Sequence, residues 1–287
     1  MFPSLPPVII RQATSQDIPA VTRFMDQALL VHRNLDWQPL MDWITKEPFL
    51  LRYEGNKLTS LMSCASDPPG VAWIHAYAMD RWSTEMEKSW RSLLEPALAI
   101  INQEDSRLYS VALHDWFKNL LISAGFSIIQ HIVVLIWNQS LPQILPVPRT
   151  VNFRPMTLSD LDSVVAIDHL AFDPLWRISQ DSMKCAFLSS AHSSVAEIDD
   201  TIVGYELSTA SHFTAHLTRL AVHPDYKLAN IGYSLVRLML EYFQRFQINQ
   251  ITVNTQQNNS ASIGLYKKLG FTLTDDSFPI YQYGITG

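Results

Sequence analysis

The sequence is poor in cysteine, glycine and charged residues for its length of 287 residues. Its two cysteines, Cys64 and Cys185, cannot form a disulfide framework, and they are too few for a thiolate zinc cluster. Charged residues make up 17% of the chain and hydrophobic residues 47%, a composition that excludes a disordered protein. The net charge of −6 argues against binding nucleic acid through its phosphates, which requires a basic surface.

Long hydrophobic runs are also missing. The longest apolar stretch, residues 128–137, is interrupted by Gln130 and His131 and is much shorter than the roughly 20 residues of a membrane-spanning helix. The first ten residues contain three prolines and no basic region, unlike a secretory signal peptide. We therefore expect a cytoplasmic protein without a membrane or nucleic-acid partner. The nine histidines show no ligand spacing, so we expect no metal site.

The chain contains an internal repeat at an offset of 143 residues. The segment IRQATSQD at 10–17 aligns with FRPMTLSD at 153–160, and IHAYAM at 74–79 aligns with LTRLAV at 217–222. A Gly-Phe pair at 125–126 matches another at 270–271, at an offset of 145 residues. Three collinear matches indicate a tandem duplication. Residues 139–150 contain three prolines and are predicted to link a first domain at 1–138 to a second at 151–287.

The second half alternates segments typical of strands and helices. We expect strands at 151–154, 194–197, 201–208, 215–222 and 251–255, with a tight turn at Asp199-Asp200. Helical spacing of apolar residues begins near Ser159, at Gly232 and at Ser260, and Gly270 suits the end of the last helix. The predicted order, β-α-α-β-β-β-α-β-α-β, describes an α/β (α+β) domain with a mixed sheet.

One turn of the second half has features of a phosphate site. The strand LAV at 220–222 leads through HPDYKLAN into the helix that begins near Gly232. A helix N-terminus presents unpaired N–H groups and the positive end of the helix dipole, and both favour an anion. Gly232 allows a close approach of the backbone, and Asn230 tolerates a left-handed conformation. Taken alone, these residues are more often found in a plain strand-to-helix connection.

A downstream motif adds a resemblance. Residues 259–271 follow the pattern N-x-x-S-x-x-L-Y-x-x-L-G-F. With LAVHPDY and K-x-x-N-I-G, this pattern resembles the GNAT superfamily of acyl-CoA-dependent N-acyltransferases over residues 151 to about 283. The first half resembles the same fold weakly. The resemblance therefore implies two tandem GNAT-like domains, the first of them degenerate.

The resemblance also implies roles for individual residues toward acetyl-CoA. The strand residues Leu220, Ala221 and Val222 would bind the pantetheine arm through their backbone groups. Asn259 would contact the cofactor, and Tyr266 would lie near the thioester sulfur. Asn230 stands where the family usually has glycine, and Lys227 where it usually has Gln or Arg. The pyrophosphate would be bound by residues of the turn and of the first helical turn: Lys227, Leu228, Ala229, Asn230, Ile231, Gly232 and Tyr233.

The implied activity is acetyl-CoA-dependent N-acetylation of a primary amine by direct attack, without a metal. Tyr266 is the candidate acid for the leaving thiolate, although its spacing also suits a core aromatic. The base is less well defined, because Asn254 stands where relatives that acetylate protein N-termini have Glu. Glu206 is the candidate base, with Glu197 and His216 as alternatives; each also suits a structural role. A non-catalytic acyl-CoA-binding or sensing module is the alternative function.

The acceptor is either a small-molecule amine or a peptide N-terminus. The segments around 172–189 and 274–281 carry Asp173 and Asp275, which would suit a cationic acceptor. In the first half, residues 80–90 contain no glycine, two tryptophans and two glutamates. Leu121 stands opposite Tyr266, and His114 opposite Asn259. We therefore predict that the first half has no cofactor site and takes the place of a second subunit, so that the protein is a monomer with an internal pseudo-dimer.

Overall fold

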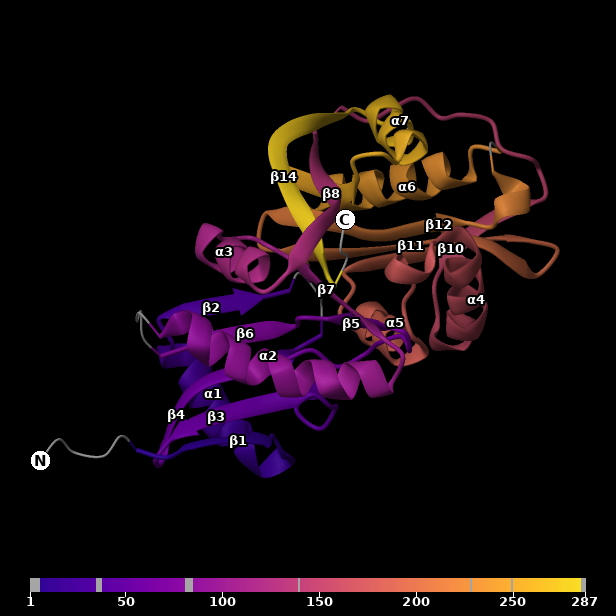
Figure 1. Ribbon diagram of the computed structural model, residues 1–287. Coiled ribbons are helices and arrows are strands. Elements are labelled where there is room, and N and C mark those ends of the chain that lie inside the picture. The colour runs from indigo at the N-terminus through magenta and orange to yellow at the C-terminus, as the bar shows by residue number, and fades with distance from the viewer. Residues whose placement is uncertain are drawn as a thin grey trace, which may run out of the picture. The chain divides into compact units, whose positions relative to one another are not determined.

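The computed structural model describes residues 6–34, 38–80, 85–138, 140–227, 229–248 and 250–284 (Figure 1). The chain forms two compact units. Unit 1 comprises residues 1–130 with 278–287, and unit 2 comprises residues 131–277. No helix in the described ranges combines the length and apolarity that crossing a bilayer requires.

Unit 1 contains a five-stranded antiparallel sheet with the strand order β1-β3-β4-β6-β2. A short parallel pair, β5 and β7, belongs to the same unit, and β7 also pairs with the end of the last strand, β14. The elements of this unit are β1 (Val8–Gln12), α1 (Ile18–Gln27), β2 (Leu30–Arg33), β3 (Phe49–Glu54), β4 (Lys57–Ser63), β5 (Val71–Trp73), β6 (Ala76–Met79), α2 (Met86–Gln103), β7 (Arg107–Val111) and α3 (Asp115–Ser123).

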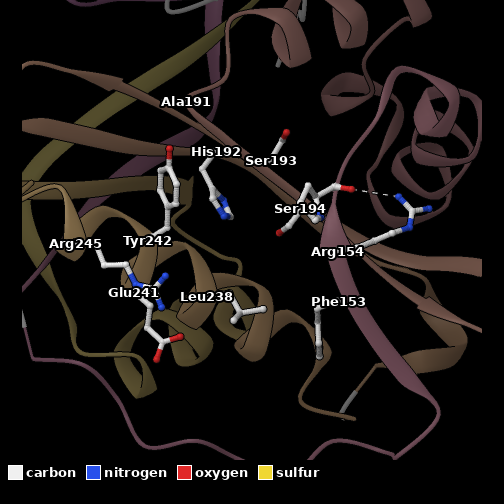
Figure 2. Close-up of a pocket in the computed structure, with 11 residues that line it drawn as sticks. Phe153, Arg154, Ala191, His192, Ser193, Ser194, Leu238, Glu241, Tyr242 and Arg245 are labelled. Atoms are coloured by element: carbon white, nitrogen blue, oxygen red, sulfur yellow. Dashed lines mark hydrogen bonds between the residues drawn. The ribbon is translucent and has the colours of Figure 1, made fainter.

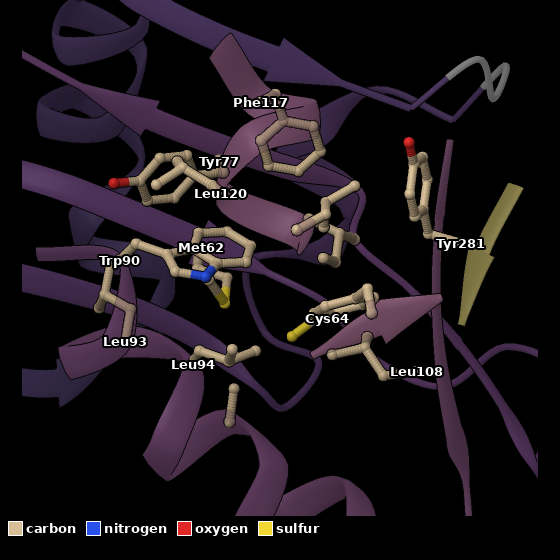
Figure 3. Close-up of a cluster of buried hydrophobic side chains, with 14 of the residues drawn as sticks. Met62, Cys64, Tyr77, Trp90, Leu93, Leu94, Leu108, Phe117, Leu120 and Tyr281 are labelled. Atoms are coloured by element: carbon tan, nitrogen blue, oxygen red, sulfur yellow. The ribbon is translucent and has the colours of Figure 1, made fainter. Parts of the chain in front are cut away.

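The main core of unit 1 is rich in aromatic side chains (Figure 3). Trp90 of α2 meets Tyr77 of β6 and Phe117 of α3 edge to face, with ring centroids 4.9 and 5.6 Å apart. All three side chains are fully buried, and Cys64 lies in the same cluster. Since each buried aromatic ring removes about 150–250 Å² from water, these residues contribute much of the stability of the unit.

Unit 2 contains a mixed sheet with the strand order β9-β10-β11-β12-β13-β8, in which only β12 and β13 are parallel. From residue 151 onward the element order is the predicted one. The elements are β8 (Phe126–Trp137), β9 (Val151–Pro155), α4 (Leu161–Ala171), α5 (Gln180–Leu188), β10 (His192–Ile198), β11 (Thr201–Ser211), β12 (Thr214–Val222), α6 (Ile231–Arg245), β13 (Gln250–Gln256), α7 (Ser260–Lys268) and β14 (Phe271–Tyr283).

The local signals that bound these elements behave as the sequence predicts. Asp199 and Asp200 both have positive φ, 46° and 59°, in the turn between β10 and β11. Gly270 follows α7 with a φ of 90°, a conformation that costs glycine nothing. The first helix differs slightly, because a 3₁₀ turn at Leu158–Asp160 precedes α4.

The two units do not coincide with the two halves of the sequence. β8 is the last strand of the first half, yet its residues 132–136 pair with β13 in unit 2. The last strand, β14, begins in unit 2, but its residues 280–282 pair with β7 in unit 1. Each half therefore supplies its final strand to the other unit. The alternation of apolar residues along a strand does not encode which strand it pairs with. The sequence therefore predicts a division at the proline-rich segment 139–150, whereas strand pairing sets the boundary between the two units.

The duplication is visible in matching side-chain contacts. In unit 1 the Arg11 guanidinium donates to Asp17 at 2.6 and 2.8 Å, and in unit 2 Arg154 donates to Asp160 at 2.7 and 2.9 Å. In both units the carboxylate also accepts the backbone N–H of a threonine three residues earlier, at the start of a 3₁₀ turn. The Arg154 hydrogen bonds lower the pKa of Asp160 to about 2, despite partial burial.

Candidate active site

The two parallel strands of unit 2 diverge toward their C-terminal ends. β12 pairs with β13 only from Thr214–Gln250 to Leu217–Val253, although the two strands continue to Val222 and Gln256. Beyond this point β12 remains paired with β11, and β13 with β8. Within the described sheet, residues 218–222 of β12 therefore have one backbone edge without a strand partner.

A β-bulge coincides with the divergence. In the ladder between β11 and β12 the register shifts between Leu207 and Ser208, which leaves Thr218 without an opposite residue. Such a bulge bends its strand and reorients the residues that follow. The free edge begins at this bulge and includes the three residues predicted to bind the pantetheine arm, Leu220, Ala221 and Val222.

A connection that contains a 3₁₀ turn at Pro224–Tyr226 leads from this edge into α6. Asn230 directly precedes the helix with a φ of 58°, a left-handed conformation that asparagine tolerates. An α helix leaves its first N–H groups without an internal partner, so Ile231, Gly232 and Tyr233 present donors at the positive end of the helix dipole. The turn thus joins a free strand edge to a site suited to an anion.

The other predicted residues of the turn are placed differently. Lys227 is exposed, so its ammonium group is free to reach a bound anion. Ala229 is half-buried and packs against the apolar cluster that includes Ile231. Leu228 lies outside the described residues.

Gly232 has a packing role in addition to its place in the turn. A Cβ at this position would lie 3.3 Å from Val222 Cγ2, 3.7 Å from Leu265 Cδ2 and 3.9 Å from Leu220 Cδ2. Gly204 on β11 is equally tight, because its Cβ would lie 3.1 Å from the Ala221 carbonyl oxygen. The two glycines therefore let the start of α6 approach the sheet closely beside the free edge.

Tyr266 lies on α7 and combines features of both of its predicted roles. It is 6% exposed and packs against Phe271, with ring centroids 5.7 Å apart. Burial raises the pKa of its hydroxyl above the ordinary value. Among the described residues none forms a hydrogen bond with this hydroxyl, so its proton is available to a ligand. Asn259 caps α7: its Oδ1 accepts the Ser262 N–H at 3.1 Å, and its Nδ2 donates to Gln256.

Glu206, the candidate base, is fully buried on the face of the sheet that α6 covers. Its carboxylate accepts hydrogen bonds from His192 Nδ1 at 2.8 Å, from Ser194 Oγ at 3.3 Å and from the Ser208 hydroxyl. Burial raises the pKa of Glu206, and these donors oppose the rise. The carboxylate is thus occupied by three protein donors.

A pocket of about 410 Å³ lies between β9, β10 and α6 (Figure 2). His192, the hydrogen-bond partner of Glu206, lines it together with Tyr242 and Leu238. The alternative bases are also engaged: Glu197 accepts from Asn152 and Arg154, and His216 Nδ1 lies 2.8 Å from Thr252 Oγ1.

Sequence reasoning missed a buried ion pair on the opposite face of the sheet. Asp168 of α4 is fully buried and accepts two hydrogen bonds from Arg219 of β12 and one from the Tyr205 hydroxyl. The only available signals were an arginine inside an apolar strand and an aspartate on the apolar face of a helix. Both patterns are common and do not reveal that the two residues meet.

Unit 1 differs from unit 2 at the corresponding strand edge. By the repeat offset, β6 corresponds to residues 219–222 of β12. One edge of β6 pairs with β4, and the other pairs with β2, from Leu30–Met79 to Arg33–Ala76. The edge that is free in unit 2 is therefore filled by the chain itself in unit 1.

The helix that corresponds to α7 also lacks the polar residues of the motif. His114 stands at the start of α3, as Asn259 does in α7, and Leu121 is buried in the core at the position of Tyr266. Of the segment 80–90, residues 81–84 lie outside the described part of the chain, and with them Trp82.

Comparisons with known proteins agree with this architecture. Residues 161–271 match the Acetyltransferase (GNAT) family. A Bacillus subtilis (strain 168) protein, provisionally assigned as an alanine N-acetyltransferase of ribosomal protein bS18, is 29% identical over 119 residues, which are 41% of this chain and 78% of that protein.

Two solved structures share the fold over almost the whole chain. One is a tandem GNAT protein from the clavulanic acid biosynthesis pathway, with a TM-score of 0.67, 13% identity, and coverage of 98% of this chain and 100% of that chain. The other is a GCN5-related N-acetyltransferase from Sphaerobacter thermophilus, with a TM-score of 0.62, 14% identity, and coverage of 97% and 96%.

Proposed function

Because its C-terminal half belongs to the GNAT family of acetyltransferases, we propose that this protein transfers the acetyl group of acetyl-CoA to a primary amine at the free edge of β12. The observation that carries the proposal is the continuity of this edge with the N-terminus of α6. Unpaired strand groups suit an extended amide-containing chain such as pantetheine, and the helix N-terminus suits its pyrophosphate.

The residues of the edge and the turn fit the cofactor. Leu220, Ala221 and Val222 would bind the pantetheine arm, and the N–H groups of Ile231, Gly232 and Tyr233 would bind the pyrophosphate. Lys227 would add a positive charge. Asn259 would contribute to cofactor binding indirectly, because its side chain already caps α7.

The transfer requires little of the protein beyond positioning. The neutral amine attacks the thioester carbonyl, a new C–N bond forms, and the C–S bond breaks. A backbone N–H of the free edge would stabilise the oxyanion. We propose that Tyr266 donates its proton to the departing thiolate, since its hydroxyl is protonated and has no protein partner among the described residues.

The amine would reach the site already neutral, and the proton that its nitrogen loses after the attack would pass to solvent, which would also return a proton to the Tyr266 phenolate. Asn254 cannot accept a proton, and the Glu206 carboxylate is occupied by His192, Ser194 and Ser208. The Bacillus subtilis relative makes a peptide with an N-terminal alanine the first acceptor to test. We propose that unit 1 has no cofactor site, because β2 fills the corresponding strand edge.

A thiol-release assay with acetyl-CoA and a panel of amines, including alanine-initiated peptides, tests the proposal. The Tyr266→Phe variant is expected to lower kcat roughly 100-fold or more while CoA still binds, as is usual when a general acid is removed. The matched control is Tyr242→Phe, which alters a tyrosine of the pocket in Figure 2 and is expected to leave kcat unchanged.

The same assay separates the two candidate functions. If CoA binds in calorimetry but no amine is acetylated, the non-catalytic binding module is the better description. If purified protein shows no binding to CoA at millimolar concentration, both functions are contradicted.

A further inference from the structure

The buried ion pair of unit 2 fastens a connecting segment to the strand that carries the free edge. Arg219 of β12 donates to both carboxylate oxygens of Asp168, one of them at 2.9 Å, and to the Trp176 carbonyl oxygen. Asp168 also accepts the Ile178 N–H at 3.2 Å, and the Phe172 ring lies 4.1 Å from Arg219 Cζ. Three points of the segment between α4 and α5, residues 172–179, are thus tied to this ion pair, two of them to Arg219 and one to Asp168.

The corresponding segment of unit 1 has a different structure. By the repeat offset, residues 173–176 correspond to 30–33, which form β2 and pair along β6. Asp168 and Arg219 correspond to Met25 and Ala76, which are both buried and apolar. Without the ion pair, the segment lies against the strand edge and fills it.

A free strand edge attracts any extended segment close to it, because unpaired backbone N–H and C=O groups are costly where water is excluded. Two features of unit 2 oppose this pairing. The segment contains Pro174, which has no N–H to donate to a ladder. In addition, the Asp168 and Arg219 contacts use the Trp176 carbonyl and the Ile178 N–H, which a new ladder would otherwise have available.

We propose that the ion pair of Asp168 and Arg219 holds the α4–α5 segment away from the free edge of β12 and so keeps this edge available to the cofactor. The two residues act as positioning residues, through the backbone of the segment. The part of the proposal that concerns the cofactor rests on the proposed function, whereas the position of the segment does not.

The test is a double variant that gives unit 2 the residues of unit 1, Asp168→Met with Arg219→Ala. Both partners are removed together, so no unpaired charge is left in the core. If the segment then pairs with the free edge of β12, we expect CoA affinity measured by calorimetry to fall at least tenfold. We also expect amide hydrogen exchange in residues 218–222 to slow in the absence of CoA, because the closing segment would protect the free edge.

Two further variants keep the result interpretable. Arg245→Ala removes an exposed arginine of α6 and is expected to change neither CoA affinity nor exchange in 218–222. Arg219→Lys keeps the charge beside Asp168 but cannot bond the carboxylate and the Trp176 carbonyl as a guanidinium does. It is expected to shift both measurements in the same direction by a smaller amount, and it serves as the test if the double variant does not fold.

A folded double or Arg219→Lys variant with wild-type affinity and wild-type exchange would overturn the proposal. A wild-type protein that does not bind CoA would contradict the proposed function instead. In that case the exchange of residues 218–222 still decides the position of the segment: slowing in the variants supports the proposal, and unchanged exchange refutes it.

Discussion

The side-chain amide of Asn230 donates a hydrogen bond to the main-chain carbonyl of Pro146 at 2.9 Å. Tyr233 and Arg237 of the same helix donate to the carbonyls of Gln143 and Pro142. The proline-rich segment predicted as a linker therefore runs along the start of α6, beside the turn that would bind the pyrophosphate. Asn230 combines this contact with a left-handed backbone conformation.

The turn should tolerate glycine at position 230 better than alanine. Both Asn230→Gly and Asn230→Ala lose the hydrogen bond to Pro146, so their difference isolates the backbone. A left-handed conformation costs an alanine roughly 1–2 kcal/mol and glycine almost nothing. We expect Asn230→Ala to be less stable than Asn230→Gly by about 1 kcal/mol in chemical denaturation. Calorimetry should also show that the alanine variant binds CoA more weakly than the glycine variant. Equal stability and equal CoA affinity of the two variants would mean that the conformation is not strained.

The close packing of α6 on the sheet can be tested with two glycines. In Gly204→Ala the new methyl group would lie 3.1 Å from a backbone oxygen, so we expect a loss of about 1–3 kcal/mol in unfolding free energy. Gly264→Ala is the matched control: it lies within α7, where a Cβ would meet no atom within 4 Å beyond its chain neighbours and the backbone of its own helix, and alanine is expected to stabilise the helix by about 0.5–1 kcal/mol. In urea denaturation we therefore expect the unfolding free energy to fall in Gly204→Ala and to rise in Gly264→Ala.

The pH dependence of kcat follows from the burial of Tyr266. Because burial raises the pKa of this hydroxyl above its ordinary value near 10, the acid remains protonated across the neutral and mildly alkaline range. We expect kcat to rise with pH as the acceptor amine loses its proton and to show no decline below about pH 10. An alkaline decline centred near pH 8 would indicate a different acid. The profile of Tyr266→Phe provides the comparison.

The repeated Arg-Asp pair should contribute to acid sensitivity. The pKa of Asp160 is lowered from its ordinary value of 3.8 to about 2, so its ionised form stabilises the folded state above pH 4. This contribution is lost as the pH falls from about 4 to about 2. We expect Asp160→Asn to lower the unfolding free energy at pH 7 by about 1–2 kcal/mol and to flatten the loss of stability in that range. Asp199→Asn, in an exposed turn, should do neither.

Local signals were sufficient for most of the second half. The turn at Asp199-Asp200 and the cap at Gly270 each depend on conformations that a few residue types favour, and each is found where the sequence predicts it, while the left-handed conformation of Asn230 is one that its residue type tolerates. The repeat itself could be read because paired residues such as Arg154 and Asp160 lie within one short segment. Such features need no knowledge of distant parts of the chain.

The sequence by itself determined the order of the elements in the second half, the duplication and the residues of the turn into α6, because each of these can be read from short segments of the chain. Tertiary structure alone decided which strands are exchanged between the units, where β12 leaves β13, and that Asp168 meets Arg219. It also decided that β2 fills in unit 1 the edge that stays open in unit 2. Each of these outcomes depends on which distant segments compete for the same backbone donors and acceptors, and the composition of a single strand does not specify its partner.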